Sequence, residues 1–294
     1  MPEEGSIDNE PIAAPKDAPL ELKLKIILRN WSYPEFREVL YREAREDSDH
    51  KEANIYKRLY AYLRALELCQ QGLSYNRVRG VIASEVGYRP SRRSLSCWLR
   101  GVHAPLGGML VFDVRRPEVG LVIGLILSDG TKRRRRYHGK LNSASQTFYN
   151  TDEGLIEEFK EACCKLGLAT YERLCPACQG LEAKSVLLYL LLKRFDEFVI
   201  KAPANLQLAF LRGLWLGDGH MGTRIELINT DLRIVSTAST LLKMHRVQHT
   251  IQGPYPQHGL GKKPMYRVYI RSCSRGKFLK LTGLADNPPR LTSP

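Results

Sequence analysis

The sequence predicts an α+β protein in which a pseudo-symmetric, internally duplicated core follows an all-α region. Two observations predict the duplication. An apolar stretch that contains glycine and closes with Asp-Gly occurs at 122–130 and again at 211–219. An Asn-Thr-Asp cluster followed by a helical pattern comes after each copy, at 150–152 and 229–231. A third observation, apolar residues at three- and four-residue steps within 20–101, predicts helices ahead of the duplicated core.

The composition indicates the kind of partner. The chain has 294 residues and a formal net charge of +14, so we expect a polyanion such as nucleic acid. Its longest apolar runs fall far short of the ~20 residues that a membrane span requires. The N-terminus is acidic and rich in proline, unlike a signal peptide. We therefore expect a soluble, cytoplasmic, nucleic-acid-binding protein with no membrane partner.

The seven cysteines are scattered and odd in number, which argues against a secreted disulfide framework. Cys175 and Cys178 stand in a Cys-Pro-Ala-Cys sequence and could supply half of a zinc site. Zinc would need two further ligands, and Cys163 with Cys164 could provide them only if adjacent residues both turned to the metal. Buried or incidental thiols are the alternative, and the sequence leaves metal binding open.

The N-terminal region divides into an acidic tail over 1–19, which we expect to be disordered, and a helical domain over 20–111. Within that domain, residues 73–101 read as helix, short turn, helix, and Ser91 is placed to cap the second helix. The pattern is similar to a helix-turn-helix, in which the second helix enters the major groove of DNA. A helical hairpin without a DNA role is the alternative. The residues expected to meet base edges are Arg92, Arg93 and Ser96.

Small residues stand four apart in each copy of the repeated motif, so one face of each predicted helix carries only small side chains. Such a face favours close backbone contact between the two helices. Their C-terminal ends would then bring Asp129 and Asp218 together, and two carboxylates repel unless they share a proton or a cation. A hard divalent ion with oxygen ligands is the expected partner. The small residues are Gly120, Gly124 and Ser128 in the first copy and Ala209, Gly213 and Gly217 in the second.

These residues resemble the LAGLIDADG homing endonucleases of the single-chain, two-motif type, whose nine-letter motif reads here as VIGLILSDG and LRGLWLGDG. The resemblance implies two αββαββα halves, over 112–200 and 201–285, with saddle-shaped antiparallel sheets and with the motif helices at their interface. Leu127 and Leu216 replace an acid at the sixth position, which varies in the family. The alternative is that each apolar helix simply ends at Asp-Gly.

The resemblance also implies a catalytic site. By position, Asp129 and Asp218 would bind the catalytic metal, magnesium or manganese, aided by the backbone carbonyls of Ser128 and Gly217. A basic residue near the scissile phosphate would be Lys184 in the first half and Arg271 in the second. The implied activity is metal-dependent hydrolysis of double-stranded DNA by a monomer that breaks both strands at a specific site.

The resemblance further implies that the basic run directly after Gly130 begins a DNA-facing sheet, and the alternating strand over 265–271 carries Arg267, Tyr269 and Arg271 on one face, which suits DNA. The first hairpin should be longer than its counterpart in the second half, and it carries the arginine run. The alternative for that run is a solvated charged face. The expected contacts of the sheets with DNA are Lys132, Arg133, Arg134, Arg135, Arg136, Lys140, Arg224, Arg267 and Tyr269.

Two other functions fit the same features. A catalytically inactive DNA-binding transcription regulator on this fold would keep the basic surface but would not need both acids, so Asp129 and Asp218 favour the enzyme. An intron RNA maturase is also compatible, since the sequence does not separate RNA from DNA. Intein excision is not expected, because the sequence starts Met-Pro and finishes Thr-Ser-Pro. The last segment, 286–294, is expected to be a tail.

Overall fold

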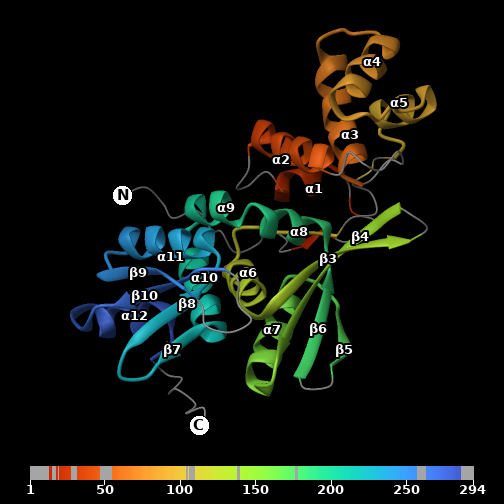
Figure 1. The fold of residues 1–294 in the computed structure, drawn as a ribbon. Coiled ribbons are helices and arrows are strands. Elements are labelled where there is room, and N and C mark those ends of the chain that lie inside the picture. The colour runs from red at the N-terminus through yellow and green to blue at the C-terminus, as the bar shows by residue number, and fades with distance from the viewer. Residues whose placement is uncertain are drawn as a thin grey trace, which may run out of the picture. The chain divides into compact units, whose positions relative to one another are not determined.

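A computed structural model shows how the chain folds (Figure 1). It describes residues 13–14, 18, 20–27, 32–46, 55–103, 105, 110–137, 140–175, 178–256 and 263–285, but not the side chains of 132–143. The chain forms two compact units. The first contains residues 1–114, 134–145 and 185–187, and the second contains residues 115–133, 146–184 and 188–294.

The N-terminal part of the first unit is helical, as the apolar spacing predicts. Its helices are α1 (Leu20–Ile27), α2 (Tyr33–Glu46), α3 (Ile55–Gln70), α4 (Tyr75–Val86) and α5 (Arg92–Leu99). Leu63 and Tyr62 of α3 are buried, as are Ile82 of α4 and Trp98 of α5. The Trp98 indole meets the Tyr62 ring edge-on with 5.8 Å between centroids. This apolar core fixes α4 and α5 on α3.

A two-residue strand, β1 (Ala13–Ala14), pairs antiparallel with β2 (Val111–Phe112). Ala13 and Ala14 belong to the segment for which we expected a disordered tail, so this part of the segment is ordered as an edge strand. The rest of the two expected tails, at residues 1–12, 15–17, 19 and 286–294, lies outside the described residues.

The repeated part of the chain contains two αββαββα series. The first consists of α6 (Pro117–Asp129), β3 (Gly130–Tyr137), β4 (Lys140–Asn150), α7 (Glu153–Lys165), β5 (Thr170–Cys175), β6 (Cys178–Lys184) and α8 (Val186–Lys193). A short helix, α9 (Phe195–Lys201), which the sequence patterns did not separate from its neighbours, follows. The second series consists of α10 (Ala204–Gly217), β7 (Gly219–Met221), β8 (Ile225–Asn229), α11 (Leu232–Met244), β9 (His249–Tyr255), β10 (Met265–Ile270) and α12 (Arg275–Thr282), with the 3-10 turn η2 (Ser272–Ser274) before α12.

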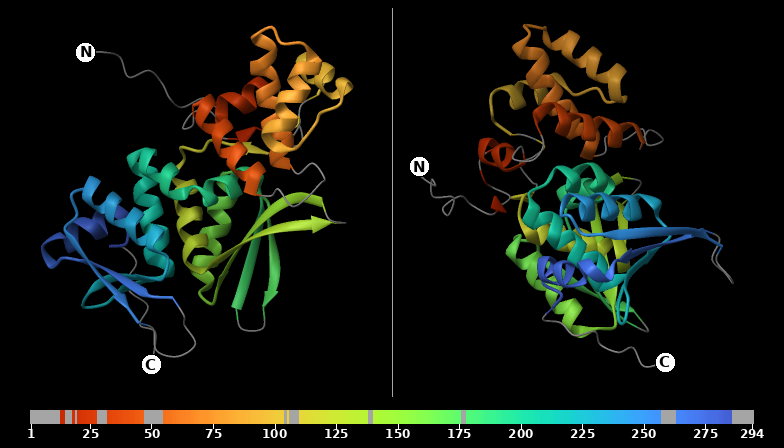
Figure 2. Two further views of the ribbon diagram at one scale, coloured as in Figure 1. Left: turned by 45° about the horizontal axis from the view of Figure 1, so that its top comes forward. Right: turned by 90° about the vertical axis from the view of Figure 1, so that its left-hand side faces the viewer.

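The two sheets share one topology. The strand orders are β3-β4-β6-β5 and β7-β8-β10-β9, so each series places its second and fourth strands at the centre. The β5–β6, β7–β8, β8–β10 and β9–β10 pairs are antiparallel. The long strands of the first sheet and the shorter ones of the second can be followed in the additional views (Figure 2). The predicted α+β class and internal duplication are confirmed.

The motif helices α6 and α10 pack side by side through their small residues (Figure 1). A Cβ atom added at Gly124 would lie 2.5 Å from the Phe210 carbonyl oxygen, and one at Gly213 would lie 2.6 Å from the Leu121 carbonyl oxygen. Side chains larger than hydrogen therefore do not fit at the crossing, and the predicted close approach is confirmed. Among the described residues, no helix has both the length and the apolar character needed to cross a lipid bilayer.

Candidate active site

Asp129 and Asp218 occupy equivalent places at the ends of the paired motif helices. Asp129 is the last residue of α6, and Asp218 directly follows α10. The two ends are close, because a Cβ atom added at Gly217 would lie 3.3 Å from Asp129 Oδ2. The packing of α6 on α10 thus brings one carboxylate from each half to the same edge, as the motif spacing predicts.

The pKa values of both carboxyl groups are raised. Burial raises the pKa of Asp129 above its usual 3.8, although a hydrogen bond from Asn150 opposes the shift. Burial raises the pKa of Asp218 further, to about 6, and the negative charge of Asp129 adds to this rise while a hydrogen bond from Asn229 opposes it. The charge of Asp129 thus disfavours ionisation of Asp218, and a cation at this edge would offset that repulsion.

An asparagine holds each motif aspartate. Asn150 Nδ2 donates to Asp129 Oδ2 at 3.0 Å, and Asn229 Nδ2 donates to Asp218 Oδ2 at 2.6 Å. The amide oxygens accept from the turns that follow, at 2.8 Å from the Asp152 N–H and 2.7 Å from the Asp231 N–H. Because those backbone groups can only donate, the amide nitrogens must face the carboxylates, which fixes the polarity of both bonds.

Sequence reasoning found the Asn-Thr-Asp clusters but gave them only the role of helix starts. That role is real, since Asp152 Oδ1 accepts from the Gly154 N–H and Asp231 Oδ1 accepts from the Arg233 N–H at the starts of α7 and α11. The additional role of the asparagines was missed. The signal available in the sequence was the recurrence of an asparagine, and not merely of a helix cap, at the same place in both halves.

The donor set at this edge suits a hard divalent ion. One oxygen of each carboxylate accepts the asparagine amide, and Oδ1 of each has no hydrogen bond to a described residue. Carboxylate oxygens with water in the remaining positions are typical magnesium ligands. Ser128 and Gly217 directly precede the aspartates, and the Ser128 hydroxyl donates back into its own helix at 2.9 Å from the Leu125 carbonyl. No cluster of three His, Cys, Asp or Glu residues suited to a metal occurs in the described parts of the chain.

The two predicted basic residues are exposed, and neither bonds to a motif aspartate. Lys184 ends β6, and its Nζ lies 4.2 Å from the centroid of the Tyr171 ring. Arg271 follows β10, where its backbone N–H donates to the Gln248 carbonyl at 2.9 Å. The Lys184 ammonium therefore already has the Tyr171 ring as a partner, whereas the Arg271 side chain has none among the described residues.

Two of the predicted DNA-facing residues of the second sheet, Arg267 and Tyr269, contact each other. Arg267 Nη1 donates to Tyr269 Oη at 3.1 Å, and its guanidinium lies 5.8 Å from the centroid of the Tyr255 ring. Arg224 is exposed in the segment between β7 and β8. The predicted side chains of the first sheet lie outside the described residues; they are Lys132, Arg133, Arg134, Arg135, Arg136 and Lys140, in β3 and β4.

The α4–α5 pair has the predicted arrangement of two helices with a short connection. Ser91 caps α5, since its hydroxyl accepts from the Ser94 N–H at 2.9 Å. Arg93 is exposed, but Arg92 is held by Asn76 of α4, whose Oδ1 accepts from Arg92 Nη2 at 2.9 Å. Ser96 is half-buried. Of the predicted pair of arginines, Arg93 is therefore the one without a partner among the described residues.

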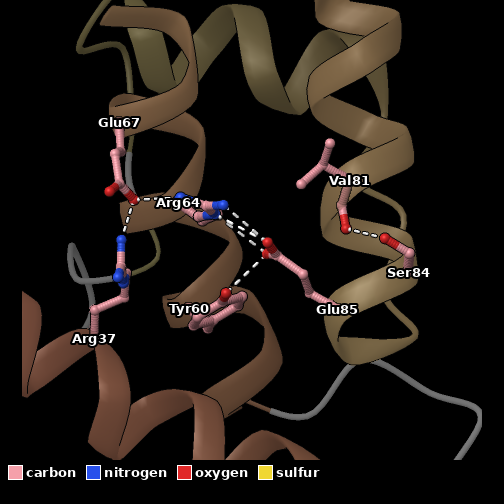
Figure 3. A network of polar contacts seen from close by, with 7 residues as sticks. All are labelled: Arg37, Tyr60, Arg64, Glu67, Val81, Ser84 and Glu85. Carbon is pink, nitrogen blue, oxygen red and sulfur yellow. Dashed lines mark hydrogen bonds and ion pairs between the residues drawn. The ribbon is translucent and has the colours of Figure 1, made fainter. Parts of the chain in front are cut away.

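A polar network fixes α4 in place (Figure 3). Glu85 of α4 accepts from Arg64 Nη2 at 2.9 Å and from Tyr60 Oη at 2.7 Å, both on α3. Arg64 also donates to Glu67 at 2.8 Å, and Glu67 forms an ion pair with Arg37 of α2. Glu85 is the one acid among residues 75–103, which contain six arginines. The network therefore neutralises the only charge in this segment that would repel a polyanion.

The structure thus contains two sheets of the same topology, each preceded by a motif helix. The two motif helices pack on each other through small residues, and an aspartate lies at the C-terminal end of each. Residues 205–283 match the family model described as "LAGLIDADG-like domain". The chain therefore carries a LAGLIDADG-like domain, which confirms the family resemblance seen in the sequence.

Other proteins show more distant similarity. A DNA polymerase of Thermococcus kodakarensis is 22% identical over 234 residues, which is 67% of this chain but only 13% of that protein. A structure of variants of the homing endonuclease I-DmoI is 21% identical, covers 56% of this chain and 94% of its own, and has a TM-score of 0.48. The N-terminal LAGLIDADG domain of DUF199/WhiA is 15% identical, covers 57% of this chain and 83% of its own, and has a TM-score of 0.42.

Proposed function

We propose that this chain is a metal-dependent endodeoxyribonuclease, a homing endonuclease that breaks both strands of a specific DNA site by hydrolysis of phosphodiester bonds. The observation that carries the proposal is the pairing of Asp129 and Asp218. Burial raises the pKa values of both carboxyl groups, and the charge of Asp129 raises that of Asp218 further, yet the fold holds the two groups together. Such an arrangement costs stability and is expected where a cation is bound for catalysis.

In this proposal each residue has a defined task. Asp129 and Asp218, with the carbonyls of Ser128 and Gly217, hold magnesium or manganese. When bound, the metal supplies Lewis-acid activation of the phosphate and lowers the pKa of the attacking water. The amides of Asn150 and Asn229 keep each carboxylate in one orientation and favour its ionised form.

Basic groups complete the site. Lys184 and Arg271 offset the charge that develops on the phosphate. For Lys184 this requires the ammonium to leave the Tyr171 ring, where it now lies. The predicted sheet residues, including Arg224, Arg267 and Tyr269, contact the DNA backbone and base edges. Since the two halves differ in their hairpins, a monomer reads an asymmetric site.

The α4–α5 pair is proposed to bind DNA as a helix-turn-helix. Exposed Arg93 at the start of α5 supplies the base or phosphate contact, and Arg92 contributes only if it exchanges Asn76 for DNA. The polar network around Glu85 holds α4 so that α5 is presented in one orientation.

The test is cleavage of a randomised duplex DNA library with magnesium, comparing the native chain with the Asp129→Asn/Asp218→Asn double variant. The proposal predicts discrete double-strand cuts that require magnesium and vanish in the double variant. Sequence-selective DNA binding without cutting, unchanged in the variant, would instead show a regulator. Selective binding of structured RNA over the same DNA would show a maturase.

A further inference from the structure

Two cysteines face each other at the end of the β5–β6 hairpin. Cys175 ends β5, Cys178 begins β6, and their Cα atoms are partners in the antiparallel register. Both residues are half-buried, and the interaction with Cys175 raises the pKa of Cys178. The sequence spacing alone shows proximity along the chain, but the structure adds that the two residues face each other across the strand pair.

We propose that Cys175 and Cys178 are a reversible modification site, a dithiol that a low-molecular-weight disulfide oxidises to an intramolecular disulfide. Partners in an antiparallel ladder have Cα atoms about 4.5–5.5 Å apart. This lies inside the range of about 4.4–6.8 Å that a disulfide bridges. The bond can therefore form without large backbone movement.

The zinc alternative receives no support from the described residues. No third His, Cys, Asp or Glu joins the two thiols in an arrangement that could hold a metal. Cys163, which the zinc alternative would need, is fully buried, and burial raises its pKa. Two sulfur ligands do not make a zinc site, so the pair is better suited to thiol–disulfide exchange.

Of the other cysteines, two have suppressed reactivity, and the exposed ones, Cys164 and Cys273, have no cysteine opposite them in a described ladder. Burial raises the pKa values of the Cys69 and Cys163 thiols and so suppresses their reactive thiolates. Cys273 is exposed, but its thiol donates to Gln248 and not to another sulfur. In the described register, Cys175 and Cys178 are the two cysteines that oppose each other across a ladder.

The pair is accessible from a cavity of about 370 Å³ between the hairpin and α7. Both cysteines line this cavity together with Glu157 and Lys160 of α7 and Leu181 of β6. An oxidant of the size of a small thiol disulfide can approach the sulfur atoms from this side.

The reaction balances as two thiol–disulfide exchanges. The thiolate of one cysteine attacks a sulfur of oxidised glutathione, forms a mixed disulfide and releases one glutathione thiolate. The second cysteine loses its proton and attacks the protein-bound sulfur of the mixed disulfide, which forms the Cys175–Cys178 bond and releases the second glutathione. The two cysteine protons end on the two released glutathione thiols. The interaction with Cys175 raises the pKa of Cys178, so the reaction should quicken as the pH increases.

The experiment uses the full chain in glutathione buffers of increasing oxidised fraction, followed by thiol alkylation and tryptic mass analysis. Cleavage after Arg173 and Lys184 yields peptide 174–184, which holds both cysteines and no other tryptic site. In oxidised glutathione we expect this peptide to be two hydrogens lighter than the dithiol form and to resist alkylation. In excess reduced glutathione we expect complete return to the doubly alkylated form.

Matched variants define the result. Cys175→Ser should leave Cys178 able to form only a mixed disulfide with glutathione, whereas Cys273→Ser should leave oxidation of the peptide unchanged. The proposal is overturned if the peptide stays fully alkylated in oxidised glutathione, or if another cysteine pair is joined first. Because the readout is the mass of a peptide, it is independent of whether the chain cleaves DNA.

Discussion

The two halves of the repeated fold differ in the lengths of their first hairpins and agree in how each motif aspartate is held. Strands β3 and β4 have 8 and 11 residues, while β7 and β8 have 3 and 5. In both halves, however, the second strand ends on an asparagine that donates to the motif aspartate and accepts from the following turn. The parts proposed to read DNA have diverged, whereas the parts proposed to cut it have kept one geometry.

The largest expected effect tests whether the contact between α6 and α10 is equally close at Gly124 and at Gly213. Gly124→Ala and Gly213→Ala each place a Cβ against backbone atoms of the partner helix, at 2.5 and 2.6 Å from a carbonyl oxygen. Both should lower the free energy of unfolding by about 3 kcal/mol, since backbone cannot move aside. Denaturant unfolding measures this.

The matched control for this contact is Gly276→Ala in α12, where an added Cβ meets open space. This change should leave stability unchanged or raise it by up to ~1 kcal/mol, because alanine favours helix. Equal costs at Gly276 and Gly124 would contradict the close packing of α6 on α10.

The second prediction concerns the asparagines. Asn150→Ala and Asn229→Ala remove the donor that orients each carboxylate, and cleavage of the corresponding strand should fall by roughly 10–100-fold, as is typical when a residue supporting a metal ligand is lost. The pH dependence of the remaining activity should move to higher pH, because the amide no longer lowers the aspartate pKa. Strand-resolved cleavage rates across pH would show this, and loss of both strand cuts in each variant would contradict separate roles for the halves.

The third prediction concerns the raised pKa of Asp218 in the folded protein. The pKa of Asp218 rises from 3.8 to about 6 on folding. An acid whose pKa is higher in the folded state disfavours folding once it ionises. Its stabilising effect is therefore complete below about pH 4 and is lost as the pH rises to about 6.

Without metal, the contribution of Asp218 to the free energy of unfolding should fall by roughly 1–2 kcal/mol between about pH 4 and pH 7, allowing for solvent screening. Asp218→Asn should remove most of this fall. Asp129→Asn should also reduce it, because the Asp129 charge contributes to the Asp218 shift. Parallel pH profiles for the native chain and Asp218→Asn would refute this interpretation.

The smallest expected effect compares two adjacent arginines. Arg93→Ala should weaken DNA binding several-fold and lower the salt dependence by about one phosphate contact. Arg92→Ala should have less effect, since Arg92 is bonded to Asn76. Binding titrations at several salt concentrations measure both, and a larger loss for Arg92→Ala would show that it leaves Asn76 on binding.

Much of this architecture could be predicted because its signals are local. Small residues four apart, closed by Asp-Gly, predicted the seam between α6 and α10 and the meeting of Asp129 with Asp218. The asparagine contacts could not be predicted in the same way. Asn150 lies 21 residues from Asp129, and Asn229 lies 11 residues from Asp218. These contacts form only when the hairpin of each half brings its second strand back to the motif helix, and the length of that hairpin differs between the halves.

The account depends most on the assignment of Asp129 and Asp218 as the ligands of the catalytic metal. The decisive measurement is strand-resolved cleavage of a target selected by the native chain, with both DNA strands labelled, for Asp129→Asn and Asp218→Asn separately. We expect each variant to bind the target and to lose the cut in a different strand or to lose both cuts. Native-like cutting of both strands by either variant would contradict the assignment of these two residues as the catalytic metal ligands.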